Sequence, residues 1–340
     1  MNWNDFKDLV KLDPAVKWTG FTPYHARSAW QKAFSDKVLK SLPKFSDINP
    51  GIKGANPDIC LMWDLAVQVV GSIGFMTFQK TGSCVGAGAA TADYHCQLGD
   101  IVADKKNYEP KFTDPFPTWG MGRKMGGGNG PGDGSYGAVQ IQAENEFGLL
   151  EAGQNGLLQP TLEDGGWLSW NEKYEYDYSW PRIWPISEST LSPIANQHKI
   201  TSFAKVTTLQ ELEDGFAQGY SATEASDFGC QNPRVNSDGL LFGGRDTTWN
   251  HQMVLGGYAK IKGTRYWLII NNWGNYNAAC PMLTERFSSK GYKTGVFWVN
   301  DNTMMNNLIK QDEVFLRSNI NGFPGRKIDW SGFAQKIHLS

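Results

Sequence analysis

Two neighbouring apolar segments constrain the fold more than any other part of this 340-residue sequence. Residues 253–259 and 265–271 are apolar, and the intervening Lys-Ile-Lys-Gly-Thr contains the glycine that is typical of a hairpin turn. The pattern predicts two antiparallel strands. Because the start of one hairpin strand and the end of the next lie at the same edge of a sheet, His251 and Asn271 are expected to be neighbours.

A second feature places a cysteine at the start of a helix. The sequence Gln79-Lys-Thr-Gly-Ser-Cys84 is typical of a turn, and the small residues that follow, up to position 96, predict a helix packed closely on every side. A thiol at a helix N-terminus experiences the positive end of the helix dipole, which lowers its pKa and favours the thiolate. The segment therefore predicts a reactive cysteine at position 84.

Together these segments resemble the papain-like cysteine peptidases. The family pattern has a glutamine, then Gly-x-Cys opening a helix, then Asn/Gly-His at a strand start, then Asn-Ser-Trp-Gly closing a strand. The matching residues here are Gln79, Gly82-Ser83-Cys84, Asn250-His251 and Asn271-Asn272-Trp273-Gly274. The resemblance extends over residues 75–315 and is closer to the bacterial and viral members than to the secreted digestive ones.

The resemblance implies an α+β, papain-like two-lobed fold, with a helical lobe, an antiparallel β-rich lobe and the active-site cleft between them. It implies that Cys84 is the nucleophile and that His251 is its base and then the acid for the leaving amine. Asn271 would fix the tautomer of His251, and Trp273 would shield their hydrogen bond from water. The side-chain amide of Gln79 and the backbone N–H of Cys84 would form the oxyanion hole.

The implied activity is that of a cysteine endopeptidase. An extended polypeptide would be the substrate and would be hydrolysed through an acyl-enzyme. No cofactor and no metal are expected. Specificity is not predicted, because the loops that form the substrate pockets vary most.

Several positions depart from the family pattern. Gln79 stands five residues before Cys84, where six are usual, so either the loop is shorter or another group is the oxyanion donor. Val85 replaces the usual aromatic residue, and Thr81 stands where the family has a disulfide cysteine. Residues 1–60 contain no papain-type pro-segment and are predicted to be an N-terminal extension.

Local patterns predict further elements around these segments. Helices are expected at 26–42, at 135–148 with Ser135 as its cap, and at 208–219, with a capping box between Thr208 and Glu211. Strands are expected at 201–206 and 295–300. The glycine-rich residues 115–134 are expected to be a surface loop, and the aromatic residues of 166–185 to cover the core.

The predicted organisation has four parts. They are an N-terminal extension at 1–60, a helical lobe with the nucleophile helix at 61–165, a β-rich lobe at 166–315 and a C-terminal tail at 316–340.

Composition excludes several classes of protein. Lys and Arg number 32 against 34 Asp and Glu, and the net charge of −2 argues against a nucleic-acid or polybasic membrane partner. No segment is long and apolar enough to span a membrane, and the N-terminus does not resemble a secretory signal. The five cysteines lack metal-type spacing and favour a reducing compartment, so we expect a cytoplasmic or virion-associated protein.

Two other functions stay open from sequence. Fold does not fix function, so the chain could be a structural or binding subunit of a larger assembly, such as a virus or phage particle, with weak or no activity. The displaced Gln79 favours this alternative. A transglutaminase-type or cell-wall amide hydrolase is less favoured, because those relatives usually place Asp or His in the third catalytic position.

Overall fold

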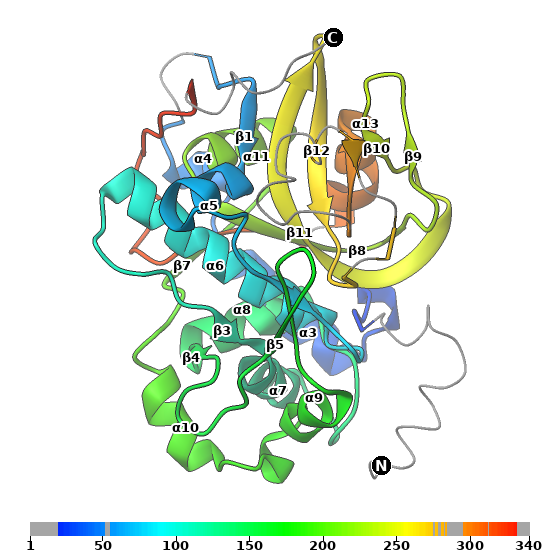
Figure 1. Ribbon diagram of the computed structural model, residues 1–340. Helices are drawn as coiled ribbons and strands as arrows, with labels where there is room; N and C mark the ends of the chain where they lie inside the picture. The colour runs from blue at the N-terminus through cyan, green and yellow to red at the C-terminus, as the bar shows by residue number, and fades with distance from the viewer. Residues whose placement is uncertain are drawn as a thin grey trace.

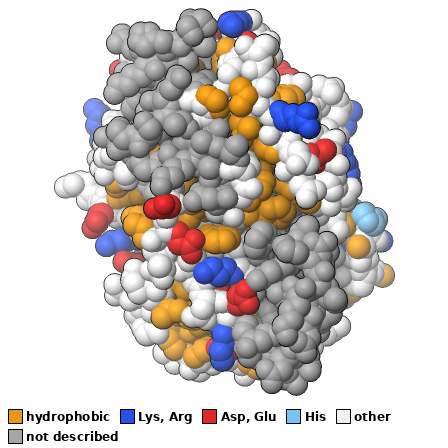
Figure 2. Space-filling model, turned by 45° about the vertical axis from the view of Figure 1, so that its right-hand side comes forward, with side chains coloured by type: hydrophobic (Ala, Val, Ile, Leu, Met, Phe, Trp, Pro, Cys, Tyr) orange, Lys and Arg blue, Asp and Glu red, His pale blue; other side chains and the backbone are white. Residues whose placement is uncertain are grey.

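The computed structural model describes residues 20–51, 55–274, 276–277, 280–281, 283, 295–311 and 313–331. The predicted N-terminal extension and C-terminal tail lie partly outside the described residues, at 1–19, 52–54 and 332–340. None of the described helices is long and apolar enough to cross a membrane. On the face drawn in Figure 2, positive and negative side chains are interspersed, which agrees with the near-zero net charge.

A mostly antiparallel sheet forms one half of the structure (Figure 1). Its nine described strands have the order β7-β14-β8-β11-β12-β13-β10-β9, with β1 paired to β11. The bounds are β1 Ile59–Leu61, β7 Ser202–Lys205, β8 Ser221–Gly229, β9 Arg234–Val235, β10 Leu241–Phe242, β11 Thr247–Ile261, β12 Thr264–Ile270, β13 Val296–Asn300 and β14 Val314–Ser318. The strands predicted at 201–206 and 295–300 are confirmed as β7 and β13.

The predicted hairpin is confirmed as β11 and β12. The two strands pair antiparallel, with Val254 opposite Ile270 near the edge where both polar ends lie. The turn consists of Lys262 and Gly263, which have φ angles of 49° and 81°. Two successive positive φ angles match the twist of the flanking strands, and glycine at the second position lowers the cost of that conformation.

Helices form most of the other half of the structure, and α6 lies between that half and the sheet (Figure 1). The helices are α3 Ala29–Ser41, α4 Phe45–Ile48, α5 Met62–Val70, α6 Cys84–Asp104, α7 Pro115–Met125, α8 Gly137–Glu146, α9 Glu172–Tyr178, α10 Glu188–Ala195, α11 Leu209–Ala217 and α13 Asp301–Thr303. Helices α4, α5, α11 and α13 instead lie beside the sheet. Two small sheets join β2 Met76–Phe78, β6 Trp167–Ser169 and β5 Thr161–Glu163, and β3 Thr113–Asp114 with β4 Leu150–Glu151.

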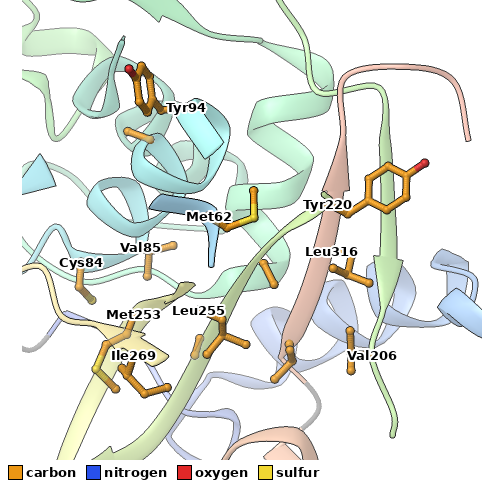
Figure 3. Packing of buried hydrophobic residues seen from close by; sticks show 14 of the residues in the cluster. Met62, Cys84, Val85, Tyr94, Val206, Tyr220, Met253, Leu255, Ile269 and Leu316 are labelled. Carbon is orange, nitrogen blue, oxygen red and sulfur yellow. The ribbon is translucent and has the colours of Figure 1, made fainter. Parts of the chain in front are cut away.

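The small residues of α6 let its neighbours approach closely, as the sequence predicts. A Cβ atom on Gly99 would lie 2.0 Å from the carbonyl oxygen of Gly219, and one on Gly86 would lie 2.7 Å from the Cβ of Trp119. Figure 3 shows the start of α6, at Cys84 and Val85, packed beside the side chains of the central strands. Helix α6 is therefore held by close contacts on several faces.

Two predicted features are wrong and one is confirmed. Residues 115–134 are not all loop, because Asp114 caps the first turn of α7 through Phe116 and Pro115 occupies its first position. Ser135 does not cap α8, which begins at Gly137 after Tyr136. The aromatic residues of 166–185 cover the core as predicted, and those that are buried are Trp167, Trp170, Tyr174, Tyr176, Tyr178 and Trp184.

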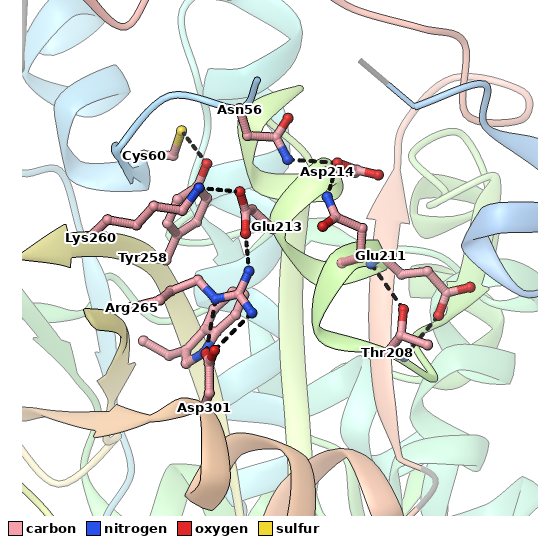
Figure 4. A network of polar contacts seen from close by, with 12 residues as sticks. Asn56, Cys60, Thr208, Glu211, Glu213, Asp214, Tyr258, Lys260, Arg265 and Asp301 are labelled. Carbon is pink, nitrogen blue, oxygen red and sulfur yellow. Dashed lines mark hydrogen bonds and ion pairs between the residues drawn. The ribbon is translucent and has the colours of Figure 1, made fainter. Parts of the chain in front are cut away.

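A charged network ties α11 to the hairpin (Figure 4). The buried carboxylate of Glu213 accepts from Lys260 at 2.7 Å and from Arg265. Arg265 also makes two bonds of 2.9 Å to Asp301, one from Nε and one from Nη2. The fork geometry fixes the orientation of the guanidinium and joins β11, β12, α11 and α13.

Candidate active site

Cys84 is the first residue of α6 and is completely buried. The residue before it, Ser83, does not cap the helix with its side chain, and its hydroxyl donates to Glu175 at 2.9 Å. The first four backbone N–H groups of a helix have no acceptor within the helix, and the N–H of Cys84 is one of them. The helix start therefore places a thiol and a backbone donor in the same position.

His251 and Asn271 meet at the edge of the sheet, as the hairpin predicts. His251 lies on β11, and Asn271 follows β12 directly. The Nε2 atom of His251 is 2.8 Å from Oδ1 of Asn271. Among the described residues, Nδ1 of His251 has no hydrogen-bond partner. A change of register between Thr248 and His251 marks a bulge in β11, a device that re-aims side chains next to functional sites.

Aromatic rings cover the bond between His251 and Asn271. The ring of Trp273 lies 4.9 Å from that of His251, with an angle of 35° between their planes. Trp249 lies 4.4 Å from Trp273, and both tryptophans are buried. This wall keeps water from the hydrogen bond. Trp249 was not predicted, although its position two residues before His251 could have indicated a ring in the same cover.

The sulfur of Cys84 lies against the strand that carries His251. Three backbone N–H groups face it, those of Gln252, Gly20 and Val85. Gln252 follows His251 directly, and its side-chain amide donates to the carbonyl of Val85 at 2.9 Å. These contacts place Cys84 beside the residue that follows His251, although 167 residues separate Gln252 from Val85 in the sequence.

Burial makes both groups neutral in this arrangement. It raises the pKa of the Cys84 thiol to about 12, against the weaker opposing effect of the three backbone donors. It lowers the pKa of His251 to about 4, although the bond to Asn271 favours the charged form. Desolvation thus outweighs the helix dipole on which the predicted thiolate depends.

A segment near the N-terminus covers the thiol. We call Gly20–Arg27 the strap. Its Thr22 N–H donates to the Ser135 carbonyl, and the Ser135 N–H donates to the Gly20 carbonyl, both at 2.7 Å. The N–H of Phe21 donates to the carbonyl of Asn250 at 2.9 Å. The backbone of Ser135 therefore binds the strap, and its side chain does not cap α8.

The strap also packs closely against the loop before Cys84. A Cβ atom on Gly20 would lie only 1.8 Å from the carbonyl oxygen of Gly82, so only glycine permits this approach. From the sequence, residues 1–60 were predicted only to be an N-terminal extension without a papain-type pro-segment, and no strap was predicted. The structure differs because the strap is recognised by backbone hydrogen bonds, which leave little trace in side-chain patterns.

The predicted oxyanion donor has another partner here. The Gln79 amide donates to the carbonyl of Thr81 at 2.8 Å, and the Gln79 N–H donates to the carbonyl of Asn272 at 3.0 Å. These bonds fold residues 79–84 into a tight loop beside the asparagine that follows Asn271. The side chain of Gln79 therefore stabilises the loop in the covered state.

Glu175, on α9, holds the same loop and was missed by the sequence analysis. Its buried carboxylate accepts from Lys80 N at 2.8 Å, Thr81 N at 3.0 Å, Thr81 Oγ1 at 2.7 Å and Ser83 Oγ at 2.9 Å. Burial raises its pKa to about 8. Glu175 lies far along the chain in an aromatic-rich segment, where no local pattern connects it to Cys84.

The described residues hold no group of three or more His, Cys, Asp or Glu side chains that could bind a metal ion. All five cysteines are buried, and none of them forms a disulfide with another described residue. The candidate site contains the thiol of Cys84, the imidazole of His251 and the amide of Asn271. This set of groups suits nucleophilic attack on a carbonyl group.

The fold is that of the papain-like cysteine proteases. The structure is similar to that of xylellain, a cysteine protease from Xylella fastidiosa, with a TM-score of 0.56 and 16% identity over 90% of this chain and 97% of that one. Digestive procathepsin L 3 from the Tenebrio molitor larval midgut matches with a TM-score of 0.48 and 13% identity, over 93% of this chain and 88% of that one. ProCathepsin B S9 from Trypanosoma congolense matches with a TM-score of 0.48 and 9% identity, over 97% of this chain and 99% of that one. No family model matches the sequence, and no curated protein matches it.

Proposed function

We propose that the protein is a cysteine peptidase that cleaves peptide bonds within polypeptides through Cys84, His251 and Asn271. The observation that supports this most is the 2.8 Å contact between His251 Nε2 and Asn271 Oδ1, covered by Trp273. It leaves Nδ1 of the imidazole for the thiol of Cys84. The order of thiol, imidazole and amide matches the roles of nucleophile, base and orienting group.

The proposed reaction begins with proton transfer from the Cys84 thiol to Nδ1 of His251. The thiolate adds to the substrate carbonyl, and His251 then returns the proton to the leaving amine, which leaves an acyl-enzyme. Water, activated by the same imidazole, hydrolyses the thioester and frees Cys84. The N–H of Cys84 would stabilise the oxyanion, and Gln79 would join it only after its amide turns away from Thr81.

The described form is closed, because the strap covers a fully buried Cys84. Peptide cleavage therefore requires the strap to move. Water would then reach the site and reduce the desolvation that holds both groups neutral. We propose a bacterial- or viral-type member, which the similarity to the Xylella fastidiosa protease supports. We also propose a reducing compartment, which the absence of a disulfide among the five buried, described cysteines supports.

A peptidyl epoxide probe tests the proposal. The wild-type protein and Cys84→Ala are incubated with the probe, and labelled peptides are identified by mass spectrometry. Labelling confined to Cys84 is expected, together with hydrolysis of a denatured protein substrate that Cys84→Ala lacks. Cys96→Ala is the matched control, because Cys96 is buried on the same helix and should leave labelling unchanged.

The second candidate is a structural or binding subunit of a larger assembly. The complete burial of Cys84 and its raised pKa favour this alternative, since a permanently covered thiol cannot act. Folded protein that is neither labelled nor active, even after the strap is loosened by Arg27→Gln, would support the binding function instead.

A further inference from the structure

Asn272, which follows Asn271, is completely buried and contacts the first turn of α6. Its Nδ2 atom donates to the carbonyl oxygen of Gln252 at 3.0 Å and, over a longer 3.5 Å, to that of Cys84. Because both partners are acceptors, the NH2 side of the amide must face them. One side chain therefore joins strand β11 directly to the residue proposed as the nucleophile.

The buried side chain of Gln252 makes a second contact of the same kind. Its Nε2 atom donates to the carbonyl oxygen of Val85 at 2.9 Å. A Cβ atom on Gly88, one turn after Cys84, would lie 3.2 Å from this nitrogen and 3.4 Å from Nδ2 of Asn272, so both amides lie against the same face of α6. We call Gln252 and Asn272 the amide clamp. It holds the first two carbonyl groups of α6 against the sheet.

The stability of the fold alone does not account for Asn272. Its Oδ1 atom is buried and has no hydrogen-bond partner among the described residues, which is costly. The family pattern has serine at this position, and a single hydroxyl would leave no amide oxygen unsatisfied. A buried amide that is only half satisfied indicates a role beyond folding.

The amide clamp lies where the two halves of the structure meet (Figure 1). Cys84 opens α6, whereas His251 lies on β11 in the sheet. In the covered form the strap also joins these halves, because its backbone bonds to Asn250 of β11 and to Ser135 ahead of α8. The relative position of the thiol and the imidazole therefore has two supports in this form.

Only one of these supports remains when the strap moves. The side chain of Arg27, at the end of the strap, is completely buried and pairs with Glu313, whose side chain is 3% exposed. This ion pair and the backbone bonds of the strap are lost together, and peptide cleavage requires that loss. The amide clamp contains no residue of the strap, so its hydrogen bonds can persist.

We propose that Asn272 and Gln252 are positioning residues, which keep Cys84 beside His251 once the strap has moved. The inference rests on the proposed peptidase function. Through the clamp, the sheet that carries the imidazole also fixes the start of α6. A displacement of about 1 Å between reacting groups can lower a rate about 100-fold, so the loss of either amide should be measurable.

Alkylation by iodoacetamide tests the inference without a peptide substrate. The reagent is small and reacts with the thiolate, so its rate reports the ionisation of Cys84 and not substrate binding. The parent is full-length Arg27→Gln, in which the strap is loosened. Asn272→Ala, Gln252→Met and the control Asn277→Ala are each added to it. The rate at Cys84 is followed between pH 5 and pH 9 by mass spectrometry.

Asn277 is a matched control because its amide also bonds to backbone groups in the segment after β12. Its Nδ2 atom donates to the carbonyl of Val296 at 2.9 Å, and its Oδ1 atom accepts from the N–H of Gly295 at 2.8 Å. Neither partner is on α6. Asn277→Ala should therefore lower the free energy of unfolding and leave the pH profile of Cys84 unchanged.

The expected result is a change in the pH profile. In the parent, the imidazolium of His251 should stabilise the thiolate, so that alkylation rises well below the free-thiol pKa of about 8.5. Asn272→Ala should move this rise toward pH 8.5 and lower the rate at pH 6 about tenfold or more. It should also lower kcat for peptide hydrolysis about 10- to 100-fold, with KM changed less than about twofold.

Gln252→Met keeps the length of the side chain but cannot donate, so it should shift the profile in the same direction. This variant carries the test if Asn272→Ala does not fold. Profiles that match the parent in both variants, or an equal shift in Asn277→Ala, would overturn the inference, because the clamp would then serve the fold alone.

Failure of the proposed function gives a different result, which appears already in the parent. If Cys84 of folded Arg27→Gln titrates as a free thiol or is not alkylated, the function fails and the inference fails with it. If the parent shows the low-pH rise but hydrolyses no peptide, the peptidase function alone fails, and the shift in Asn272→Ala still decides the role of the clamp.

Discussion

Glu175 holds the loop that leads into Cys84, so replacing it should lower the free energy of unfolding by an amount set by the hydrogen bonds that are lost. In Glu175→Gln one carboxylate oxygen becomes an NH2 group, which cannot accept. If the remaining oxygen faces Thr81 and Ser83, only the Lys80 N–H loses its acceptor, which costs about 1–3 kcal/mol. In Glu175→Ala the backbone N–H groups of Lys80 and Thr81 both lose their acceptor, which costs about 2–6 kcal/mol.

The cost of Glu175→Gln depends on pH. The pKa of Glu175 is raised from 4.5 to about 8 by burial, so the folded state binds the proton more tightly than the unfolded state. The associated stability is fully present below pH 4.5 and is lost as the pH rises through 8. At 1.36 kcal/mol per pKa unit, the loss is about 5 kcal/mol at most. Glutamine does not titrate, so the variant lacks this loss.

Urea unfolding of wild type, Glu175→Gln and Glu175→Ala at pH 5, 7 and 9 tests the reasoning. The wild type should be more stable than Glu175→Gln at pH 5, and the difference should shrink or reverse by pH 9. Asp177→Asn is the control, because Asp177 lies on the same helix in an exposed ion pair with Lys173 and should change stability by less than about 0.5 kcal/mol. A difference between wild type and Glu175→Gln that is constant from pH 5 to pH 9 would refute the reasoning.

Three further predictions concern the site, the strap and the fold. Asn271→Ala should lower kcat about 10- to 100-fold with little change in KM, because it removes the hydrogen bond that orients the imidazole; unchanged peptide hydrolysis would contradict this. Arg27→Gln should loosen the strap and so raise the rate of Cys84 alkylation by iodoacetamide at pH 8 about tenfold or more. Lys37→Gln, on the exposed face of α3, is the control and should leave this rate unchanged. Equal alkylation rates in Arg27→Gln and the wild type would contradict the covering role of the strap. Thr208→Ala should lower the free energy of unfolding by about 1 kcal/mol through loss of the α11 capping box, measured in urea, and no change would show that the cap contributes nothing.

Local patterns predicted the parts of the fold whose causes lie close together in the chain. The hairpin of β11 and β12 follows from two apolar runs and a glycine turn, and it places His251 near Asn271 without further information. The capping box at Thr208 and the small residues of α6 are likewise visible in the sequence. In each case the interacting groups lie on one strand pair or one helix.

The contacts that define the covered site have no such local cause. Arg27 and Glu313 are 286 residues apart, and the Glu175 carboxylate reaches Thr81 across 94 residues. A single charged side chain in a loop or helix gives no periodic signal, so its partner is known only when the chain is folded. The strap over Cys84 depends on backbone groups, which every residue carries.

The protonation state of Cys84 also depends on one local cause, visible in the sequence, and on one that only the tertiary structure shows. The sequence alone placed Cys84 at a helix N-terminus, and from that position a lowered pKa is expected. Only the tertiary structure decided that the thiol is fully buried, with a pKa raised to about 12. The dipole is a property of one helix, whereas desolvation is set by every group packed around the sulfur, the strap included.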